Sequence, residues 1–403
     1  MRAVSFTLVV AISAIAVAKS PAQSQPPQIW QMQNSGSTAG LRGIDSVDGK
    51  VAWASGTEGT VLKTLDGGAH WQKCAIPDAA TDGITLDFRG VQAWDAEMAI
   101  VMASGPGDKS RLYKTTDGCK TWKLLLRNAD PDGFYDAFWL NAIYGEGMLL
   151  GDPVKGRFTV LKTEDGGVTW SRDQSKSLEL HGDSLAAFAA SNGSIGKASR
   201  GEGDTRGPGT DYFPGFVTGG KSGAYLIERW EGRSQQKARF SHGRYSSLDL
   251  LPDWNRRVIP LAAGGDSAGA FALALRYTGS PCDDCGFGTY WHLVAVGGDY
   301  TKPNESVGTA AASSADSGQH WTASTTPPHG YRSAVQWSQS EKLWITAGTN
   351  GSDISRDDGR TWQPLDDGNW NALSLPFVVG PNGRIARINP DALARPPAAR
   401  EEK

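Results

Sequence analysis

The sequence has 403 residues, 39% of them hydrophobic, and a formal charge of −3, which indicates a globular protein rather than a disordered chain or a membrane bundle. It contains 50 glycines and 15 tryptophans, whereas glycine usually supplies about 7% of residues. Many short strands joined by tight turns produce such a composition, and a helical bundle does not. The slight acidity disfavours a nucleic-acid partner, which would require a basic surface.

The first 22 residues are predicted to be a signal peptide. Arg2 precedes an apolar run from Phe6 to Ala18, which is too short to span a bilayer, and Ala16-Val17-Ala18 fits a cleavage site. The first cysteine is Cys74, so no lipid-anchoring cysteine follows the cleavage site. We therefore expect an exported monomer, periplasmic or secreted, without a stable membrane anchor. The alternative is an uncleaved N-terminal anchor.

Five segments repeat the pattern Ser/Thr-x-Asp-x-Gly-x-x-Trp, in which Cys119 once replaces the glycine. The aspartate of such a box accepts hydrogen bonds from the turn backbone, and the glycine supplies turn dihedral angles. The tryptophan opens the next strand and packs on a neighbouring repeat. The box residues, which we expect to serve structure rather than catalysis, are Asp66, Asp117, Asp165, Asp316, Asp357, Trp71, Trp122, Trp170, Trp321 and Trp362.

The repeats predict an all-β fold, a seven-bladed β-propeller over residues 28–390. Each unit holds four short strands in about 40 to 50 residues, which is one propeller blade. The expected blades are 41–76, 86–127, 137–173, 183–240, 268–324, 330–365 and 369–388. Only three strands can be found in the last blade, and we expect the strand at Trp30 to complete it and close the ring. Residues 228–267 are predicted to be an irregular insertion, and residues 391–403 a disordered tail.

The box-bearing units resemble a known family, the photosystem II stability/assembly factors. The resemblance rests on units such as Arg111-Leu-Tyr-Lys-Thr-Thr-Asp117 and on the strand Leu41-Arg42-Gly43-Ile44, and it covers roughly residues 28–227 and 268–388. It implies a seven-bladed propeller that is not an enzyme and binds a protein partner during assembly. The box alone is less specific, because sialidases, xyloglucan-cleaving hydrolases and sortilin-type receptors also carry it. The chain departs from the family pattern at 228–267 and around Cys282.

Three arginines occupy the same position in the first strand of their blades, the strand that lines the central channel. They are Arg42, Arg89 and Arg332, and Asp136 lies near the equivalent place in the third blade. Guanidinium groups suit carboxylate or phosphate ligands, so these residues are predicted to form an anion-binding patch. The resemblance implies that such an arginine-rich surface binds the partner. The alternative is that each arginine pairs with a carboxylate of a neighbouring blade.

A glycoside hydrolase of the same propeller type is the alternative function. It needs two carboxylates that flank one bond, or an arginine trio in a sialidase. Asp152 and Asp299, each just after a second strand, are the best candidate carboxylates. The Arg-Ile-Pro motif of sialidases is absent, and a sialidase would have six blades, so we favour binding over hydrolysis.

The cysteines and histidines predict no cofactor and no metal site. Cys282-Asp-Asp-Cys285 lies on an expected hairpin tip, where a local disulfide or unpaired thiols are favoured over redox chemistry, which needs a helix N-terminus. Cys74 and Cys119 could bridge adjacent blades, although spacing does not assign the pairing. The six histidines show no metal-ligand spacing.

Overall fold

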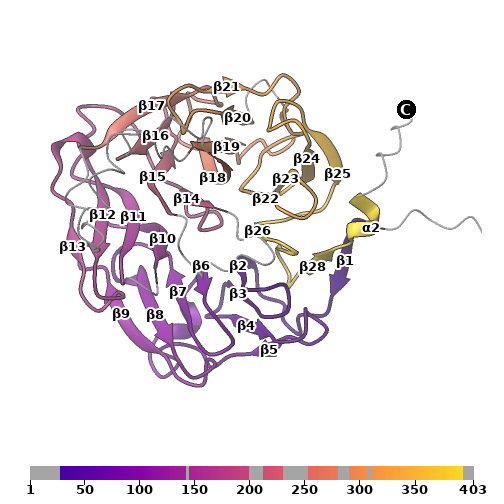
Figure 1. Cartoon of the computed structure of the whole chain (residues 1–403). Helices are drawn as coiled ribbons and strands as arrows, with labels where there is room; N and C mark the ends of the chain where they lie inside the picture. The colour runs from indigo at the N-terminus through magenta and orange to yellow at the C-terminus, as the bar shows by residue number, and fades with distance from the viewer. Residues whose placement is uncertain are drawn as a thin grey trace, which may run out of the picture.

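The computed structural model describes residues 28–141, 145–198, 212–229, 253–279, 290–306 and 310–393. Its strands form seven antiparallel blades around a central axis (Figure 1). In each blade the first strand lies nearest the axis and the fourth lies on the outer rim. The predicted all-β, seven-bladed fold is confirmed.

The first three blades follow the chain without interruption and match the predicted ranges. Blade one contains β2 (Leu41–Ser46), β3 (Ala52–Gly56), β4 (Val61–Thr64) and β5 (Gln72–Lys73). Blade two contains β6 (Phe88–Ala93), β7 (Ala99–Ala103), β8 (Arg111–Thr115) and β9 (Lys123–Arg127). Blade three contains β10 (Tyr135–Leu140), β11 (Gly147–Val154), β12 (Arg157–Thr163) and β13 (Ser171–Arg172). Three single-turn 3-10 helices lie in the connections, η1 (Gly83–Thr85), η2 (Gly107–Lys109) and η3 (Lys176–Leu178).

Blades four and five share one continuous sheet. Blade four contains β14 (Ile195–Ala198), β15 (Tyr212–Thr218), β16 (Ala224–Glu228) and β17 (Asn255–Ile259). Blade five contains β18 (Ala268–Gly279), β19 (Tyr290–Asp299), β20 (Ala311–Ser314) and β21 (Thr322–Ala323). The two inner strands β14 and β18 pair in parallel, which joins the blades at the channel.

Blades six and seven close the ring. Blade six contains β22 (Ala334–Ser338), β23 (Leu343–Gly348), β24 (Gly351–Ser355) and β25 (Gln363–Asp366). Blade seven contains β26 (Ala372–Ser374), β27 (Phe377–Val379), β28 (Ile385–Ile388) and, from the other end of the chain, β1 (Trp30–Gln33). A short helix, α2 (Pro390–Leu393), follows β28.

Closure by the N-terminal strand is confirmed. β1 runs antiparallel to β28, and Trp30 lies opposite Ile388. The Trp30 ring is 4% exposed, packs 6.0 Å from the Trp370 ring, and donates its Nε1–H to Ser352 Oγ of blade six at 2.9 Å. The strand therefore fills the outer edge of blade seven and also attaches it to the preceding blade.

Blade four differs from the predicted boundaries. Its fourth strand, β17, lies inside the range 228–267 that the sequence assigned to an insertion, and beyond the predicted end of the blade at residue 240. The sequence Asn255-Arg-Arg-Val-Ile259 is polar because the strand lies at the rim, and Val258 is 68% exposed there. Trp254 directly precedes it, in the place where a box tryptophan precedes other rim strands, and is 6% exposed.

Three other predicted segments lie wholly or partly outside the described residues. The signal peptide, residues 1–22, and the pair Cys282 and Cys285 lie entirely outside them. The predicted tail begins at residue 391, but residues 391–393 belong to α2, whose Leu393 is 2% exposed and accepts a hydrogen bond from Arg356 through its carbonyl.

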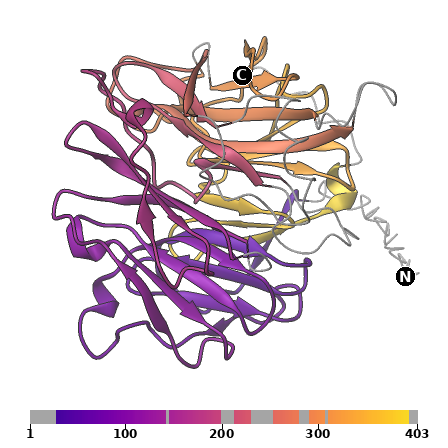
Figure 2. The ribbon, with the colours of Figure 1, turned by 60° about the vertical axis from the view of Figure 1, so that its left-hand side comes forward.

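The core consists of apolar layers between neighbouring blades, whose sheets pack against one another around the ring (Figure 2). Between blades one and two, Trp53, Phe88 and Tyr113 are fully buried. Each blade offers an apolar residue on both faces of its middle strands, as in β3, where all five residues are buried. Burial on both sides explains why these strands read as short apolar runs rather than as alternating patterns.

Candidate functional site

Four inner strands carry a β-bulge near their start, after the first residue of β2, β6 and β10 and after the third residue of β18. The pairing skips one residue between Leu41 and Gly43, and it does the same near the start of β6, β10 and β18. A bulge leaves one residue without a ladder partner and re-aims its side chain. The residues skipped in this way are Arg42, Arg89, Asp136 and Phe271.

In blades one, three and five, a glycine of the second strand permits a close approach of the two strands beside the bulge. A Cβ on Gly56, Gly151 or Gly297 would lie 2.3, 2.3 or 1.8 Å from a backbone oxygen of the inner-strand segment. Side chains are thus excluded from the second strand there. The space at one mouth of the channel is left to the bulged residues, which we call the mouth residues.

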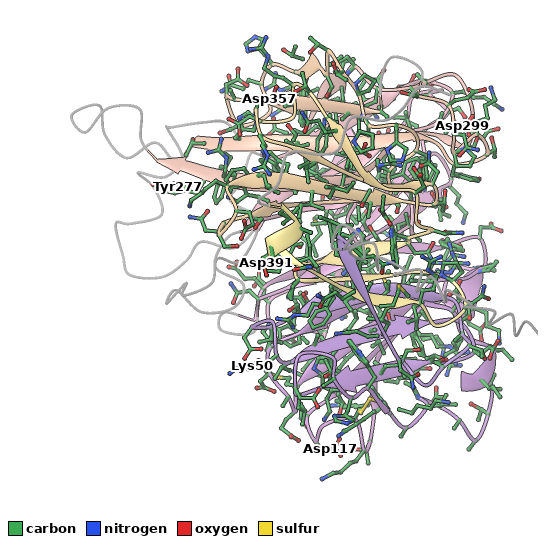
Figure 3. All side chains as sticks on the ribbon, turned by 90° about the vertical axis from the view of Figure 1, so that its right-hand side faces the viewer. Lys50, Asp117, Tyr277, Asp299, Asp357 and Asp391 are labelled. Atoms are coloured by element: carbon green, nitrogen blue, oxygen red, sulfur yellow. A yellow bond between two sulfur atoms is a disulfide. The ribbon has the colours of Figure 1, made fainter. Side chains whose placement is uncertain are left out.

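The mouth residues lie on one face of the ring. The β18–β19 hairpin fixes its direction, because Ala268 pairs with Asp299 at one end and Tyr277 with Trp291 near the other. Figure 3, which shows the ring from the side, places Asp299 and Tyr277 on opposite faces. The bulge at Phe271 lies near the Asp299 end, so the mouth opens on the Asp299 face.

Arg42 and Arg89 converge on one carboxylate. Arg89 Nε donates to Asp87 Oδ2 at 2.8 Å, and Arg42 Nε lies 3.4 Å from Asp87 Oδ1. The two arginine side chains remain 36% and 29% exposed. The Arg89 guanidinium also reaches toward blade three, 5.8 Å from the centre of the Phe134 ring. Two guanidinium groups therefore share a single acid and keep donors available at the mouth.

Two carboxyl groups, one buried and one partly buried, lie beside this pair. Asp136 is 1% exposed, and its Oδ2 has no hydrogen-bond partner among the described residues. Asp152, on the adjacent strand β11, accepts a hydrogen bond from the Ala187 N–H at 3.2 Å. Burial raises the pKa of Asp152 to about 6. Burial, followed by the charge of Asp152, raises the pKa of Asp136 well above its usual range, while Arg89 acts in the opposite direction.

Aromatic rings cover the other half of the mouth. Phe271 stacks on Phe188 with ring centres 3.8 Å apart and meets Tyr331 edge-on at 4.8 Å. Tyr300, 52% exposed, lies 6.1 Å from Phe271. The charge of Arg42 acts on Tyr331, so the cationic pair and the aromatic group are neighbours. The mouth thus combines a cationic side, a buried acidic pair and an apolar wall.

Arg332 does not join this group, because it lies one residue before the position of Arg42 in its blade: its N–H donates to the Gly297 carbonyl of the preceding blade, as the Leu41 N–H donates to the Gly380 carbonyl. It is fully buried and ion-paired with Asp353 of β24, which is also fully buried. Its Nε donates to Asp353 Oδ2 at 2.6 Å, and its Nη1 donates to the Tyr331 carbonyl at 2.7 Å. Within its own blade, its donors are already used. Arg332 thus pairs with a carboxylate, but the acid belongs to its own blade and not to a neighbouring one, as the alternative had it. Of the three arginines, Arg42 and Arg89 remain at the mouth.

Asp299 and Asp152 have different environments. Burial acts to raise the pKa of Asp299, but hydrogen bonds from Thr301 and Ser267 outweigh it and lower the pKa below its usual value. Thr301 donates from both its backbone N–H and its hydroxyl, at 2.9 and 2.7 Å. Asp299 is therefore held ionised at the end of β19, whereas Asp152 is the partly buried member of a carboxyl pair with the buried Asp136.

The five boxes share one hydrogen-bond pattern on the outer side of the ring. In each, Oδ1 of the aspartate accepts the backbone N–H four residues later at 2.8 to 3.0 Å. Hydrogen bonds from Thr169, through its side chain and backbone, lower the pKa of Asp165 to about 2. Figure 3 places Asp117 and Asp357 at opposite edges of the molecule. Their positions fit a role in turns, away from the mouth.

The box tryptophans contact the preceding blade. Trp71 meets Phe377 of blade seven edge-on at 5.8 Å, Trp122 Nε1 donates to the Ala75 carbonyl at 2.8 Å, and Trp362 Nε1 donates to Ser324 Oγ at 3.2 Å. A disulfide between Cys74 and Cys119 adds a covalent bond between blades one and two. Each box therefore joins its own hairpin to a neighbour.

Three residues at the mouth, the bulged Phe271 and its surroundings Asp87 and Tyr331, were not identified from the sequence. Asp87 could have been found, because Asp-x-Arg places it two residues before Arg89 on an extended segment. Phe271 occupies the bulge position of blade five, which becomes visible only when the inner strands are aligned. In the part of the chain that the structure describes, no three His, Cys, Asp or Glu side chains are grouped as metal ligands. Within the same residues, no helix has the length and apolarity to cross a membrane.

These features define a seven-bladed β-propeller with a charged mouth on one face. No family model matches the sequence. Over 164 residues the chain is 26% identical to the "Photosystem II assembly lipoprotein Ycf48" of Synechococcus sp. (strain CC9902), a match that covers 40% of this chain and 44% of the relative. The chain thus matches less than half the length of this curated relative.

Two solved structures share the fold. One, described as "YCF48 bound to D1 peptide", has a TM-score of 0.53 and 15% identity, and covers 91% of this chain and 98% of that one. The other, YCF48 from Cyanidioschyzon merolae, has a TM-score of 0.51 and 17% identity, with 90% and 99% covered. The comparisons support the resemblance to photosystem II assembly factors that the repeats indicated.

Proposed function

We propose that this protein is an exported, non-enzymatic β-propeller assembly factor that binds an acidic segment of a protein partner at the channel mouth. The observation that carries the proposal is the convergence of Arg42 and Arg89 on the single carboxylate of Asp87, with both guanidinium groups still partly exposed. Planar guanidinium groups pair with carboxylates through two parallel hydrogen bonds. An incoming carboxylate can therefore accept hydrogen bonds from the guanidinium N–H groups of Arg42 and Arg89 that Asp87 does not engage.

The similar proteins support the same class of function. The curated relative is named an assembly lipoprotein of photosystem II, and one structural neighbour is described with a bound peptide. Export rests on the predicted signal peptide at residues 1–22, and the monomeric state and the absence of a stable membrane anchor are part of the same proposal.

The proposal is tested by titrating the protein into a dye-labelled oligo-aspartate peptide and following fluorescence anisotropy. We expect the Arg42→Gln/Arg89→Gln variant to bind about tenfold more weakly or not at all, a loss of about 1.4 kcal/mol or more. Wild-type affinity should fall between about 0.05 M and 0.5 M salt, because exposed charges are screened.

A matched control removes the same charge from the rim of the same blade. Lys123→Gln/Arg127→Gln alters two exposed cations of β9, the outer strand of blade two. This variant should bind like the wild type. Equal losses in the two variants would show a general effect of net charge, and unchanged binding in Arg42→Gln/Arg89→Gln would refute the proposed site.

The glycoside hydrolase alternative has one observation in its favour, the pKa of about 6 for Asp152, which suits a general acid. Its second predicted carboxylate, Asp299, has a lowered pKa and is hydrogen-bonded to Thr301. A panel of chromogenic glycosides tests this alternative. Turnover that Asp152→Asn abolishes would establish a hydrolase, and we expect no turnover above the buffer background.

A further inference from the structure

The charges at the mouth do not favour an acidic ligand when every carboxyl group is ionised. Arg42 and Arg89 supply two positive charges, and Asp87, Asp136 and Asp152 supply three negative ones. The group then carries a net charge of −1, which would repel the segment that the arginines are placed to bind. One proton on the buried pair makes the mouth neutral, and two make it positive.

Asp136 and Asp152 are placed to share protons. Asp136 is the bulged residue beside Tyr135, and Tyr135 pairs with Gly151, the residue before Asp152. Like charges held close together in a buried site cannot both ionise easily. The Oδ2 atom of Asp136 receives no hydrogen bond from the described residues, so nothing there stabilises its charged form through that oxygen.

The surroundings of the pair contain few other charges. Of the strands packed against β10, β11 brings Asp152 and β6 brings Arg89, while β7 and the described side chains of β14 bring none. The strand β12, packed against β11, brings Arg157 and Lys162, which are ion-paired with Glu179 and Asp173. Asp87, the residue before β6, is engaged with Arg42 and Arg89. Arg89 is therefore the cation that faces both the buried pair and an incoming anion.

We propose that anion binding by Arg42 and Arg89 is coupled to protonation of Asp136 and Asp152, so that the mouth holds an acidic segment when the pair is protonated and releases it when the pair ionises. This inference rests on the proposed function and specifies its regulation. An ionised pair draws the Arg89 guanidinium toward itself and repels the ligand, and a neutral pair does neither.

The direction in which affinity changes with pH follows from thermodynamic linkage. A bound anion favours the protonated pair by the same free energy by which the protonated pair favours the anion. Affinity should be highest below the pKa of Asp152, which is about 6, and should fall as the pH rises above it. If one proton is taken up on binding, affinity falls by up to about tenfold per pH unit in that range.

The test measures affinity for an oligo-aspartate peptide, labelled with a pH-insensitive rhodamine dye, from about pH 5.5 to about pH 8. The peptide stays ionised over this range, since aspartate has a pKa of about 3.9. We expect the wild type to bind roughly tenfold more weakly at the upper end. Asp136→Asn/Asp152→Asn should bind with nearly constant affinity and, at about pH 8, more tightly than the wild type.

A matched control changes an acid on the same face. Asp299→Asn removes a negative charge near the mouth without removing the buried pair, so it should keep the wild-type slope with pH. A second measurement uses the wild type alone: calorimetry in two buffers with different ionisation enthalpies should reveal proton uptake on binding near pH 7. This measurement does not depend on whether the double variant folds.

The outcomes separate the two proposals. Binding that is independent of pH in the wild type, or an unchanged slope in Asp136→Asn/Asp152→Asn, would overturn the proton coupling and leave the arginine site standing. Binding of equal strength after Arg42→Gln/Arg89→Gln, or no binding at any pH, would overturn the arginine site and the coupling together. A pH slope that the double variant loses, together with proton uptake in the wild type, would establish the coupling.

Discussion

Folding removes the carboxyl group of Asp136 from water and that of Asp152 in part, and among the described residues neither forms an ion pair. Burial disfavours the charged form of an acid, which is why the pKa of Asp152 rises to about 6. Such groups reduce stability at neutral pH and are retained for another reason when they lie at a functional surface. The box aspartates behave in the opposite way, because hydrogen bonds lower their pKa values.

We predict that Asp152→Asn stabilises the protein at about pH 8 and has little effect at about pH 4. The folded protein holds its proton up to about pH 6, whereas the unfolded chain releases it near its ordinary value, so stability from this group falls as the pH rises through that window. The increase in the free energy of unfolding at about pH 8 is at most about 3 kcal/mol. Thermal unfolding at the two pH values measures it, and an equal effect at both would contradict the burial account.

At the scale of single elements, the Cys74–Cys119 disulfide joins the outer strand of blade one to the box turn of blade two. Cys119 stands where other boxes have glycine and adopts a positive φ of 68°. A side chain is strained in this region, so the cysteine is tolerated there together with the bond that it forms. The disulfide lies on the rim, far along the blade from the inner strands that carry the mouth residues.

We predict that Cys74→Ala/Cys119→Gly lowers the free energy of unfolding by about 3–4 kcal/mol. The bond closes a loop with a sequence separation of 45 residues, for which chain entropy gives a value of this size. Glycine at 119 restores the usual box and offsets part of the loss through its tolerance of positive φ. Chemical denaturation measures the change, and peptide binding should be unaltered. A variant as stable as the wild type would show that the disulfide does not stabilise the fold.

The blade boundaries show which elements the sequence patterns could predict. The boxes marked five hairpins because Asp, Gly and Trp have fixed roles in the turn, and the inner-strand alignment found Arg42 and Arg89. The strand β17 was missed because a rim strand is half exposed and carries polar residues, although Trp254 before it was an available signal. Arg332 was misjudged because its partner Asp353 comes from another strand of its blade, and alignment does not reveal side-chain pairing.

At the scale of the whole molecule, the ring depends on contacts between the two ends of the chain. β1 supplies the fourth strand of blade seven, and the Trp30 ring is buried against Trp370. Closure removes the free edge of the last blade, which would otherwise expose unpaired backbone groups. A closed ring also fixes the distance between blades one, two and three, which hold Arg42, Arg89 and Asp136.

We predict that deletion of residues 23–34 lowers the free energy of unfolding by several kcal/mol, since burial of one large aromatic side chain alone contributes about 3 kcal/mol. Trp30→Phe is the milder variant: it keeps the strand, loses the hydrogen bond to Ser352, and should cost about 1 kcal/mol. Thermal unfolding compares the two with the full chain. A deletion variant that melts at the same temperature would show that β1 does not close the ring.

In the proposed function, an acidic partner segment binds at the mouth on the Asp299 face of the ring. The most direct measurement is photolabelling: an oligo-aspartate peptide with one photoreactive residue is crosslinked to the protein near pH 5.5, and the labelled fragments are identified by mass spectrometry. The account predicts labels on the inner-strand starts near Arg42, Arg89 and Phe134, and their loss in Arg42→Gln/Arg89→Gln. Labels on the outer strands or on the opposite face, near Tyr277, would contradict it.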